Sequence, residues 1–405
     1  MRTRFRDRRH SLLSILRTRL LTDAYWLMAL RMFLSVPSFP GARYTARRLA
    51  NLYLGRLEVW RGRTRLRSRP IKLNVEATNI CNLECPACFT GVGQNGRARS
   101  HMSLELYRKL LDELGPYLFQ VELHNWGEPL LARHLVPMIE EAHRAGIQTT
   151  LSTNFSFPFT AERAEAIVRA GLDVFGVSID GARQETYEQY RRGGKLDTVL
   201  ANCRLMRDAK SRLGSATPLL IWEFHVFSHN TDDIERARAL AADLEMGIAV
   251  VKGWVAGPEW DVERRFGYFA DSSPFPCSYL WHHAIVNNDG GVAPCCGTFY
   301  REDDMGRVAT ATGEEGNTTF REVWNSDRFQ TARRFFNERS GSAADHEHIC
   351  FECPTTKLWE RYRAHVAAGG TFHTFTGAHS ANDAFNYFWN RRPAGSDARA
   401  RGGRG

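Results

Sequence analysis

Strand-like and helix-like segments alternate between residues 71 and 257 of this 405-residue chain, and this alternation constrains its fold more than any other feature. Runs rich in β-branched and other apolar residues predict strands at Ile71–Val75, Gln120–Leu123, Gln148–Ser152, Val174–Ile179, Leu219–Phe227 and Ile248–Trp254. Apolar residues at helical spacing predict helices at Ser103–Leu114, His134–Ala145, Ala161–Arg169, Glu185–Arg191, Leu196–Lys210 and Thr231–Leu244. Strands separated by helices in this way predict an α/β fold with a parallel sheet and outer helices.

Three cysteines follow the first predicted strand closely, at Cys81, Cys85 and Cys88. Such short spacings let one loop wrap around a metal centre at a low entropic cost of loop closure. Three thiolates can hold a four-iron cluster with one iron left open to an external ligand, much as a catalytic zinc site keeps an open position. The alternative is half of a structural zinc site whose fourth ligand lies elsewhere in the chain.

The Cys81-x3-Cys85-x2-Cys88 arrangement after a strand resembles the radical S-adenosylmethionine (radical SAM) enzymes. The resemblance implies that the open iron of a 4Fe–4S cluster chelates S-adenosylmethionine (SAM). An electron from a reduced flavodoxin or ferredoxin-type donor then splits SAM into methionine and a 5′-deoxyadenosyl radical, which abstracts a substrate hydrogen. The resemblance also implies that the six strand–helix units form a partial (β/α)6 TIM-like barrel, with its site at the carboxyl ends of the strands.

Polar motifs follow the second, third and fourth predicted strands. The segment Trp126-Gly127-Glu128-Pro129 resembles the family's GGEP segment, which receives the SAM amino group, although Trp126 replaces the usual first glycine. Gly127 permits close backbone approach and Glu128 can accept a hydrogen bond from an ammonium. By itself, each motif could be ordinary turn chemistry. The SAM-binding candidates that the resemblance implies are Trp126, Gly127, Glu128, Ser152, Thr153, Asn154, Ser178 and Asp180.

One position departs from the family pattern. Relatives often have an aromatic residue just before the third cysteine, where it packs against adenine, and here that residue is Ala87. Phe89 is a candidate replacement. The adenine contact is therefore left open, whereas the thiolate ligands are unaffected.

A second group of cysteines lies between residues 277 and 354. Asp289-Gly290-Gly291 between two apolar runs predicts a hairpin, and the group resembles the twitch domain, the shortened form of the SPASM domain of many radical SAM enzymes. The resemblance implies one auxiliary 4Fe–4S cluster, held by Cys277, Cys295, Cys350 and Cys353. Cys296 could compete with Cys295, four thiolates would also suit structural zinc, and Cys203 is expected to be a buried helix residue.

Charge is distributed unevenly along the chain. Residues 1–72 contain 18 Lys and Arg against 3 Asp and Glu, whereas the remainder contains 36 against 42, so nucleic-acid binding by the body is not expected. We expect a basic helical extension at 1–70, a radical SAM barrel at 71–257 and a small α+β SPASM/twitch domain at 258–354. A helical, aromatic segment at 355–389 and a disordered basic tail at 390–405 are expected to follow. Clustered cysteines without a signal-peptide pattern indicate a reducing, cytoplasmic location.

Residues 11–36 have apolar residues at helical spacing, but Arg17, Arg19, Asp23 and Arg31 interrupt every apolar run. No run approaches the ~20 residues that a membrane span needs. A basic amphipathic helix of this kind could make peripheral contact with an anionic membrane surface, or it could pack against protein, which we favour. A second basic helix is expected from Tyr44 to about Arg65.

The expected chemistry is an oxidation. An auxiliary cluster can accept an electron from the substrate radical, and a base must then remove a proton. Candidate bases near the strand ends are Glu76, Glu223, His225 and Lys252. A small molecule or glycan is the favoured substrate, because residues 1–70 lack the strand pattern of the leader-binding segment in many peptide-modifying relatives. Peptide maturation is the second hypothesis, and a non-catalytic iron–sulfur or zinc scaffold is the third.

Overall fold

The computed structural model describes residues 36–94, 96–253, 260, 262, 277–309, 319–335, 349–351, 353, 364 and 368. The chain divides into two compact units, Met1–Phe39 and Pro40–Gly405, and every helix and strand named below belongs to the second. Nearly all of the helix expected at 11–36 lies outside the described residues, as do nearly all of the segment at 355–389 and the whole tail at 390–405. None of the helices in the described ranges has the length and apolar character that crossing a bilayer requires.

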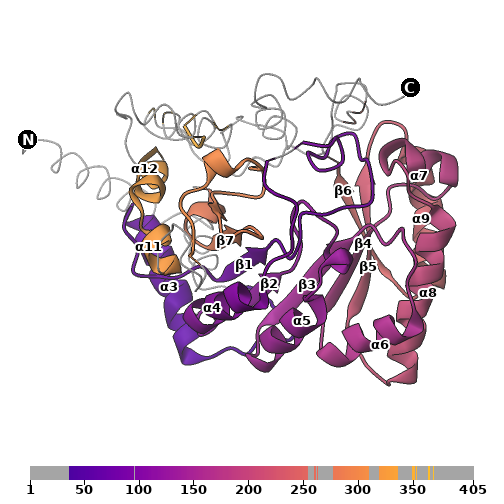
Figure 1. Ribbon diagram of the computed structural model, residues 1–405, viewed down its shortest axis with the longest axis horizontal. Helices are drawn as coiled ribbons and strands as arrows, with labels where there is room; N and C mark the ends of the chain where they lie inside the picture. Colours follow the sequence, from indigo (N-terminus) through magenta and orange to yellow (C-terminus); the bar gives the residue numbers. More distant parts are fainter. Residues whose placement is uncertain are drawn as a thin grey trace, which may run out of the picture. The chain divides into compact units, whose positions relative to one another are not determined.

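Within the described residues, eight strands form one sheet in the order β6-β5-β4-β3-β2-β1-β7-β8 (Figure 1). The first six along the chain are β1 (Lys72–Val75), β2 (Gln120–Glu122), β3 (Gln148–Thr153), β4 (Val174–Ser178), β5 (Leu219–Val226) and β6 (Gly247–Lys252). Each neighbouring pair among these six is parallel. The sheet does not close on itself, because β6 and β8 are its two edges. The predicted α/β fold with a partial barrel is therefore confirmed.

The helices between these strands also follow the prediction. They are α4 (Leu104–Leu114), α5 (Leu135–Arg144), α6 (Ala161–Ala170), α7 (Gln184–Tyr190), α8 (Leu196–Arg212) and α9 (Ile234–Asp243), with 3-10 turns η1 (Pro129–Leu131) and η2 (Thr231–Asp233). Ser103 and Thr160 begin α4 and α6, because each hydroxyl accepts a hydrogen bond from the third backbone N–H of its helix. Gly171 ends α6 with a φ of 84°, which glycine adopts without strain.

The two faces of the sheet differ in chemistry, because successive side chains of a strand point to opposite sides. Leu73, Val121, Leu151, Phe175 and Trp222 are at most 2% exposed and form one core with the helices. The opposite side, which we call the inner face, has mainly polar side chains in register. These are Lys72, Asn74, Glu122, Gln148, Ser152, Ser178, Glu223 and His225. One face of the sheet therefore builds the core, and the other offers hydrogen-bonding groups.

The predicted hairpin consists of β7 (His283–Val286) and β8 (Val292–Ala293), and it extends the barrel sheet. β7 pairs in parallel with β1, so that His283 lies opposite Lys72, and β8 pairs antiparallel with β7. Gly290, in the turn between them, has a φ of 87°. This pairing brings the second group of cysteines beside β1: Cys277 and Cys295 lie toward the amino end of the β1–β7 pair, whereas the loop after β1 leaves its carboxyl end.

Residues 40–70 pack against the barrel. Their helix α3 (Ala46–Trp60) begins with Thr45 as its cap. The buried guanidinium of Arg48 in α3 donates to the carbonyl oxygens of Gly115 (3.1 Å) and Ala145 (3.0 Å), which follow α4 and α5. Arg48 therefore satisfies carbonyl groups at the ends of two barrel helices.

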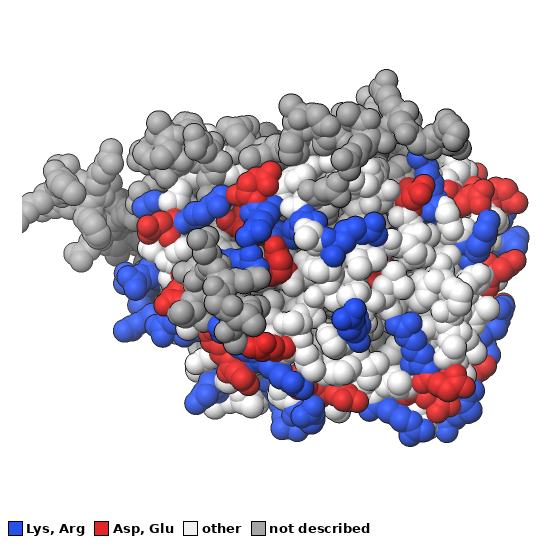
Figure 2. Space-filling model, in the orientation of Figure 1, with Lys and Arg blue, Asp and Glu red and all other residues white. Residues whose placement is uncertain are grey.

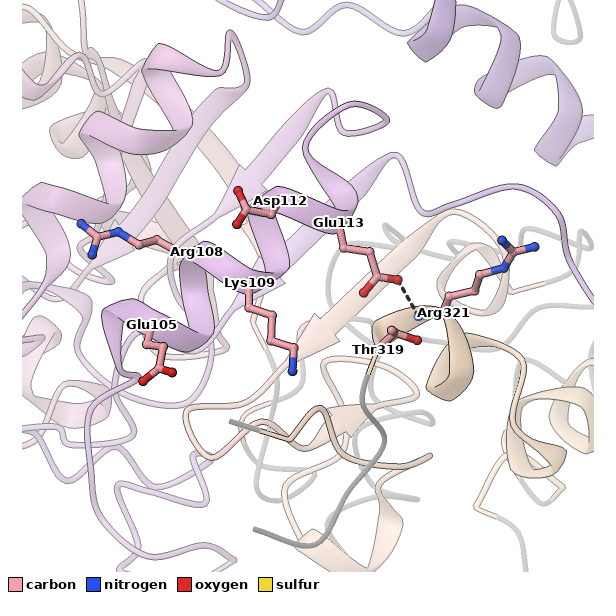
Figure 3. Close-up of a pocket in the computed structure, with 7 residues that line it drawn as sticks. All are labelled: Glu105, Arg108, Lys109, Asp112, Glu113, Thr319 and Arg321. Carbon is pink, nitrogen blue, oxygen red and sulfur yellow. Dashed lines mark hydrogen bonds between the residues drawn. The ribbon is translucent and has the colours of Figure 1, made fainter. Parts of the chain in front are cut away.

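The hairpin is followed by α11 (Phe320–Trp324) and α12 (Asp327–Phe335), with the short turns η4 (Ser278–Leu280) and η5 (Arg301–Asp303) on either side of the hairpin. Glu113 of α4 accepts hydrogen bonds from the backbone N–H groups of Phe320 and Arg321, both at 2.8 Å. Figure 3 shows this carboxylate reaching the start of α11 across a shallow groove. Glu113 thereby fixes α11 to the barrel helix α4.

Candidate active site

The first three cysteines lie on the loop that follows β1, at the carboxyl edge of the sheet. Burial raises the pKa of the Cys81 thiol to about 11 and that of the Cys85 thiol to about 12, and neighbouring thiols add to both shifts. The pKa of Cys88 is raised for the same reasons. Crowded, buried thiols become thiolates when a metal replaces their protons, so this loop fits the ligand set of a cluster.

Gly91 closes the cysteine loop, and the sequence reasoning did not single it out. A Cβ at residue 91 would lie 2.5 Å from the carbonyl oxygen of Cys85 and 2.6 Å from its nitrogen. The chain after Cys88 therefore passes directly over Cys85, which only glycine allows. A glycine three residues after the third cysteine was the available signal.

The Gly-Glu-Pro segment lies against the cysteine loop. The backbone N–H of Glu128 donates to the carbonyl oxygen of Ile80 at 2.8 Å. A Cβ at Gly127 would lie only 2.0 Å from the carbonyl oxygen of Thr78. Gly127 is thus required for the approach of the two loops, in addition to any contact that it makes with a ligand.

Glu128 is buried and is largely occupied by protein donors. Its Oε1 accepts from the Thr153 hydroxyl (2.6 Å) and the Leu130 N–H (3.0 Å), and its Oε2 accepts from the Asn154 N–H (2.8 Å). Burial raises the pKa of this carboxyl, although these hydrogen bonds oppose the shift. A carboxylate has about four acceptor positions, so Oε2 keeps one for a ligand. The Asn154 amide also contacts the Cys81 sulfur at 3.7 Å.

Asp180 does not offer a free carboxylate, and this changes the role that the sequence suggested for it. Its Oδ1 accepts from the backbone N–H of His225 and meets His225 Nδ1, both at 2.9 Å, and its Oδ2 accepts from Arg191 Nε at 2.6 Å. Burial acts to raise the pKa of Asp180, but Arg191 and His225 outweigh it and hold the pKa at about 2. Asp180 is therefore a buried anchor for two other side chains.

Arg191, at the end of α7, was not predicted as a site residue. Arg191 forms an ion pair with Asp180 and also lies beside Cys85. Its hydrogen bond and positive charge act to lower the pKa of the Cys85 thiol. A guanidinium in this position offsets negative charge on a cluster thiolate. A cation that lies eleven residues after a strand-end aspartate carries no local signal, and only the fold brings the two together.

Glu223 and His225 lie on the inner face of β5, but Lys252 does not share that face. Glu223 accepts from the hydroxyls of Ser152 and, at 3.2 Å, Ser178. Lys252 follows Ile248 and Val250 in strand parity, and those two side chains pack against the helix-covered core. Lys252 is therefore removed from the set of candidate bases. The sequence reasoning placed it near the strand end correctly but could not give its direction.

Glu76 is also an unsuitable base, although it lies at the end of β1. Its side chain is 1% exposed, and it accepts from the backbone N–H of Asn288 in the hairpin turn at 3.3 Å. Burial raises its pKa to about 7. Glu76 therefore connects β1 to the hairpin, and its buried carboxyl is held by the backbone of the hairpin turn.

The cysteines of the second group are also close to one another. Burial raises the pKa of Cys277 to about 12, with Cys353 as the next cause that raises it. The pKa of Cys295 is raised by burial and by the thiols of Cys296, Cys277, Cys353 and Cys350. Within the described ranges, no three His, Cys, Asp or Glu side chains are close enough to ligate a single metal ion.

Cys295 and Cys296 have different surroundings, which bears on the alternative that the sequence left open. The Cys296 sulfur lies 3.1 Å from the Tyr279 hydroxyl. Cys295 is surrounded by the other thiols of the group. Cys296 also acts on the Cys277 thiol, so both adjacent thiols lie near the group and the assignment of Cys295 stays a prediction. Cys203, as expected, is a buried residue of α8.

An aromatic cluster joins the two cysteine loops, and we call Phe89, Trp126, Phe299 and Tyr300 the aromatic bridge. Cys81 and Cys88 pack against this cluster. The Trp126 indole N–H donates to the carbonyl oxygen of Thr298 at 2.9 Å, and the Thr298 hydroxyl donates to the carbonyl oxygen of Cys295 at 2.9 Å.

Phe89 stacks on Phe299 within the aromatic bridge, with ring centroids 5.1 Å apart, and it is 1% exposed. Its ring is therefore covered by its neighbours in the aromatic bridge, and the position of an adenine contact stays a prediction.

An open parallel barrel with a three-thiol loop after its first strand and further thiols beside its edge hairpin defines an iron–sulfur protein built around a partial barrel. The comparison with known families agrees with this geometry. Residues 75–223 match the radical SAM superfamily, and residues 277–354 match SPASM, an iron–sulfur cluster-binding domain. The chain belongs to the radical SAM superfamily and has a SPASM domain. Its cofactors are accordingly a SAM-binding 4Fe–4S cluster, an auxiliary iron–sulfur cluster and SAM.

Individual relatives cover parts of the chain. A PqqA peptide cyclase of Ruegeria pomeroyi is 29% identical over 191 residues, which are 46% of this chain and 49% of the relative. A GTP 3′,8-cyclase of Peptoclostridium acidaminophilum is 29% identical over 186 residues, 44% and 54% of the two chains. The match thus spans about half the length of these curated relatives. The crystal structure of Streptococcus suis SuiB bound to S-adenosylmethionine has the same fold, with a TM-score of 0.52 at 12% identity over 85% of this chain and 83% of that one.

Proposed function

We propose that this radical SAM enzyme oxidises a polar small molecule or glycan at a carbon–hydrogen bond. The observation that carries the proposal is the Asp180–His225 pair, in which Asp180 follows β4 and His225 lies near the end of β5, on the polar inner face of the barrel. When bound, the cofactors supply the 5′-deoxyadenosyl radical that takes the hydrogen atom and a second cluster that can take the remaining electron. The residues of the chain must then bind the substrate, orient it and accept a proton.

Cofactor binding is assigned to the two cysteine groups and the strand-end residues. Cys81, Cys85 and Cys88 would hold the first cluster, and Cys277, Cys295, Cys350 and Cys353 the auxiliary cluster. The remaining acceptor position on Glu128 Oε2 suits the SAM ammonium. Arg191 would balance the charge of the first cluster through Cys85.

His225 is the proposed base. Asp180 accepts from both the backbone N–H and the ring Nδ1 of His225, which keeps the ring proton on Nδ1 and leaves Nε2 as the acceptor. The His225 side chain is 30% exposed, so a substrate can reach it. A positioned base of this kind contributes about 10²–10⁴-fold to a rate. Glu223, held by two serine hydroxyls on the same face, would bind a substrate hydroxyl or amine.

The character of the inner face supports a hydroxylated or aminated substrate. Hydroxyl, amide, carboxylate and ammonium groups line it from β1 to β5, as in Lys72, Glu122, Ser152, Ser178 and Glu223. Lys72 pairs with Glu122, and the Ser152 and Ser178 hydroxyls donate to Glu223, so a substrate bound here must offer groups that replace or extend these hydrogen bonds. A sugar or cyclitol offers several such groups at once.

Peptide maturation is the second candidate. A PqqA peptide cyclase is among the curated relatives, and SuiB has also been solved bound to the precursor peptide SuiA, with a TM-score of 0.50 to this chain. A peptide would place one side chain on the inner face and leave its backbone at the barrel mouth. The two candidates therefore differ in the substrate but share the bases and cofactor ligands proposed above.

Deuterium transfer tests the proposal. The anaerobically reconstituted enzyme is incubated with SAM, dithionite and carbon-deuterated polyols, sugars or peptides, and deuterium in 5′-deoxyadenosine is measured by mass spectrometry. We expect transfer from a polyol or sugar. Transfer from a peptide alone would favour the second candidate, and absence of 5′-deoxyadenosine under all conditions would refute the enzymatic proposal.

A variant tests the role of His225. His225→Gln should still transfer deuterium from the substrate but should form oxidised product about 10²–10⁴-fold more slowly. His143→Gln, at the exposed end of α5, is the matched control and should leave both rates unchanged. Equal product formation by His225→Gln and the wild type would remove His225 from the mechanism.

A further inference from the structure

Four arginines alternate along the segment between α3 and β1, at residues 61, 63, 65 and 67, and each of them is exposed. Leu66 and Ser68, on the intervening parity, are 2% and 1% exposed. The arginines therefore lie on the outer side of this segment, successive α-carbons at most ~7 Å apart. We call this set, together with Arg321, the arginine row.

The backbone beneath the arginine row is held firmly. Glu58 accepts from the backbone N–H groups of Arg67 (2.7 Å) and Ser68 (3.0 Å), and Asn51 exchanges two hydrogen bonds with the backbone of Arg69. The Glu58 carboxylate is thus used for backbone groups and not for guanidinium groups. The segment presents its arginines from a fixed base.

The guanidinium groups of the arginine row have no acidic partner among the described residues. They line a groove of about 760 Å³ with Glu58 and Glu322, but none of the five arginines forms an ion pair within the described part of the chain. Glu322 is engaged in the capping box of α11 with Thr319. Figure 3 shows the Arg321 guanidinium pointing away from the Glu113 carboxylate, which binds its backbone N–H.

Figure 2 shows Lys and Arg side chains at the left edge, where Figure 1 draws α3 and α11. The groove combines five positive charges with two negative ones that are used elsewhere. Its arginines are spread along a segment and do not converge on one point. Such a surface suits several carboxylates on another protein better than one phosphate group.

The inner side of the same segment touches the peptide that follows Cys277. The Trp281 indole N–H donates to the carbonyl oxygen of Arg63 at 3.3 Å. The buried guanidinium of Arg333 donates to the carbonyl oxygens of Leu280 (2.8 Å) and Thr64 (2.9 Å). Leu280 in turn donates its N–H to the carbonyl oxygen of Cys277 at 3.2 Å. One short turn and one indole ring thus separate the arginine row from an auxiliary-cluster cysteine.

We propose that the arginine row docks an acidic one-electron carrier protein, with a flavin or iron–sulfur centre, which exchanges electrons with the auxiliary cluster. This rests on the proposed function, in which the substrate radical leaves one electron on that cluster and one proton on His225. In the exchange, one electron would pass from the cluster that Cys277, Cys295, Cys350 and Cys353 would hold to the oxidised carrier, and no atom would be transferred. Carboxylates of the carrier pair with the guanidinium groups, so the complex forms quickly at low ionic strength and weakens with salt.

The test measures electron transfer without substrate. Dithionite-reduced, desalted holoenzyme is mixed anaerobically with an oxidised acidic flavodoxin, and flavin reduction is followed by stopped-flow absorbance. Arg61→Glu/Arg63→Glu/Arg65→Glu should lower the second-order rate by about tenfold or more, whereas reduction of a small neutral quinone should be unchanged. A triple reversal on the helices α8 and α9, at Arg204, Arg212 and Arg238, of which the last two pair with Glu165 and Glu235, should leave both rates unaffected.

The wild-type enzyme provides a second measurement that does not depend on the folding of a variant. Its rate with flavodoxin should fall as ionic strength rises from about 0.05 to about 0.5 M, because the Debye length shortens from more than ~10 Å to less than ~8 Å. Equal rates for both triple variants, or a rate that is independent of salt, would overturn the proposal. The proposal would also be overturned if the arginine variant lost binding to anionic vesicles or RNA but kept its electron exchange with flavodoxin. A failure of substrate oxidation with normal electron exchange would instead refute the proposed function alone.

Discussion

Replacing Trp126 by Phe should separate SAM cleavage from substrate turnover, because Trp126 joins the two cysteine loops. Its indole N–H donates to the carbonyl oxygen of Thr298, and the Thr298 hydroxyl donates in turn to the carbonyl oxygen of Cys295. The Trp126 ring packs edge-on against Phe89 and Phe299. Phe keeps an aromatic ring at the site but removes the hydrogen bond. The Gly-Glu-Pro segment would then be less firmly held against the hairpin.

The magnitude follows from the contacts. Trp126 is 8% exposed, so the Thr298 carbonyl loses its indole partner in a mostly buried setting, at a cost of about 1–3 kcal/mol. The smaller ring adds roughly 1 kcal/mol for the space that it leaves. The total of about 2–4 kcal/mol corresponds to a fall in Tm of roughly 3–5 °C for a unit of this size. If half of that energy positions the loops, coupling should fall about tenfold.

The assay compares 5′-deoxyadenosine with product in the same reaction. Trp126→Phe should keep at least most of the SAM cleavage but form about tenfold less product per 5′-deoxyadenosine. The matched control is Tyr107→Phe, which also removes one buried donor, the Tyr107 hydroxyl bond to the Met138 carbonyl oxygen at 3.0 Å in the helix-covered core. Tyr107→Phe should lower Tm by a few degrees without changing the ratio.

Two outcomes would contradict a coupling role for the aromatic bridge. If Trp126→Phe lowers Tm as expected but leaves the ratio of product to 5′-deoxyadenosine unchanged, the bridge is structural only. If Tyr107→Phe shifts the ratio equally, then any loss of stability uncouples the reaction and Trp126 has no special part.

Three further predictions concern other parts of the site. Glu76→Gln should leave stability unchanged near pH 4 and raise it by up to about 3 kcal/mol by pH 8. The pKa of Glu76 is about 7 in the folded state, above its unfolded value, so Glu76 ionises first in the unfolded chain and wild-type stability falls as the pH rises through this window. Equal Tm differences at both pH values would contradict this. Gly127→Ala should abolish SAM binding measured by calorimetry, since its Cβ would lie 2.0 Å from a cysteine-loop carbonyl oxygen, whereas Gly247→Ala on the edge strand should bind SAM normally. Cys350→Ala/Cys353→Ala should lower iron content and substrate turnover but spare SAM cleavage; equal loss of both activities would mean that these thiols serve folding only.

Local sequence patterns were sufficient to predict the helices and strands of the barrel. Predicted and observed α8, for example, both begin at Leu196, and the prediction ends at Lys210 where the helix ends at Arg212. Capping hydroxyls, apolar periodicity and turn glycines act within a few residues, so they can be recognised without the fold. The cysteine spacings likewise indicated the family, and the matches to the radical SAM and SPASM domains confirmed it.

The sequence predicted the directions of side chains less well. Lys252 and His225 both lie near strand ends, yet Lys252 shares the parity of the core residues and His225 that of the inner face. Cys295 and Cys296 are adjacent in the sequence, and only the folded chain shows that the Cys296 sulfur meets the Tyr279 hydroxyl. A rotation of one strand or turn would exchange the directions of two adjacent side chains, and a single sequence does not show which direction each side chain takes.

By itself, then, the sequence determined the alternating strands and helices and the kind of cofactor, and it predicted the thiol ligands, because each depends on short spacings along the chain. The tertiary structure decided what meets across long separations: β7 beside β1, Arg191 between Asp180 and Cys85, and the arginine row over the peptide after Cys277. These contacts depend on strand register and on the packing of distant segments. Both are fixed only when the whole sheet forms, since parallel pairing joins residues that no local signal connects.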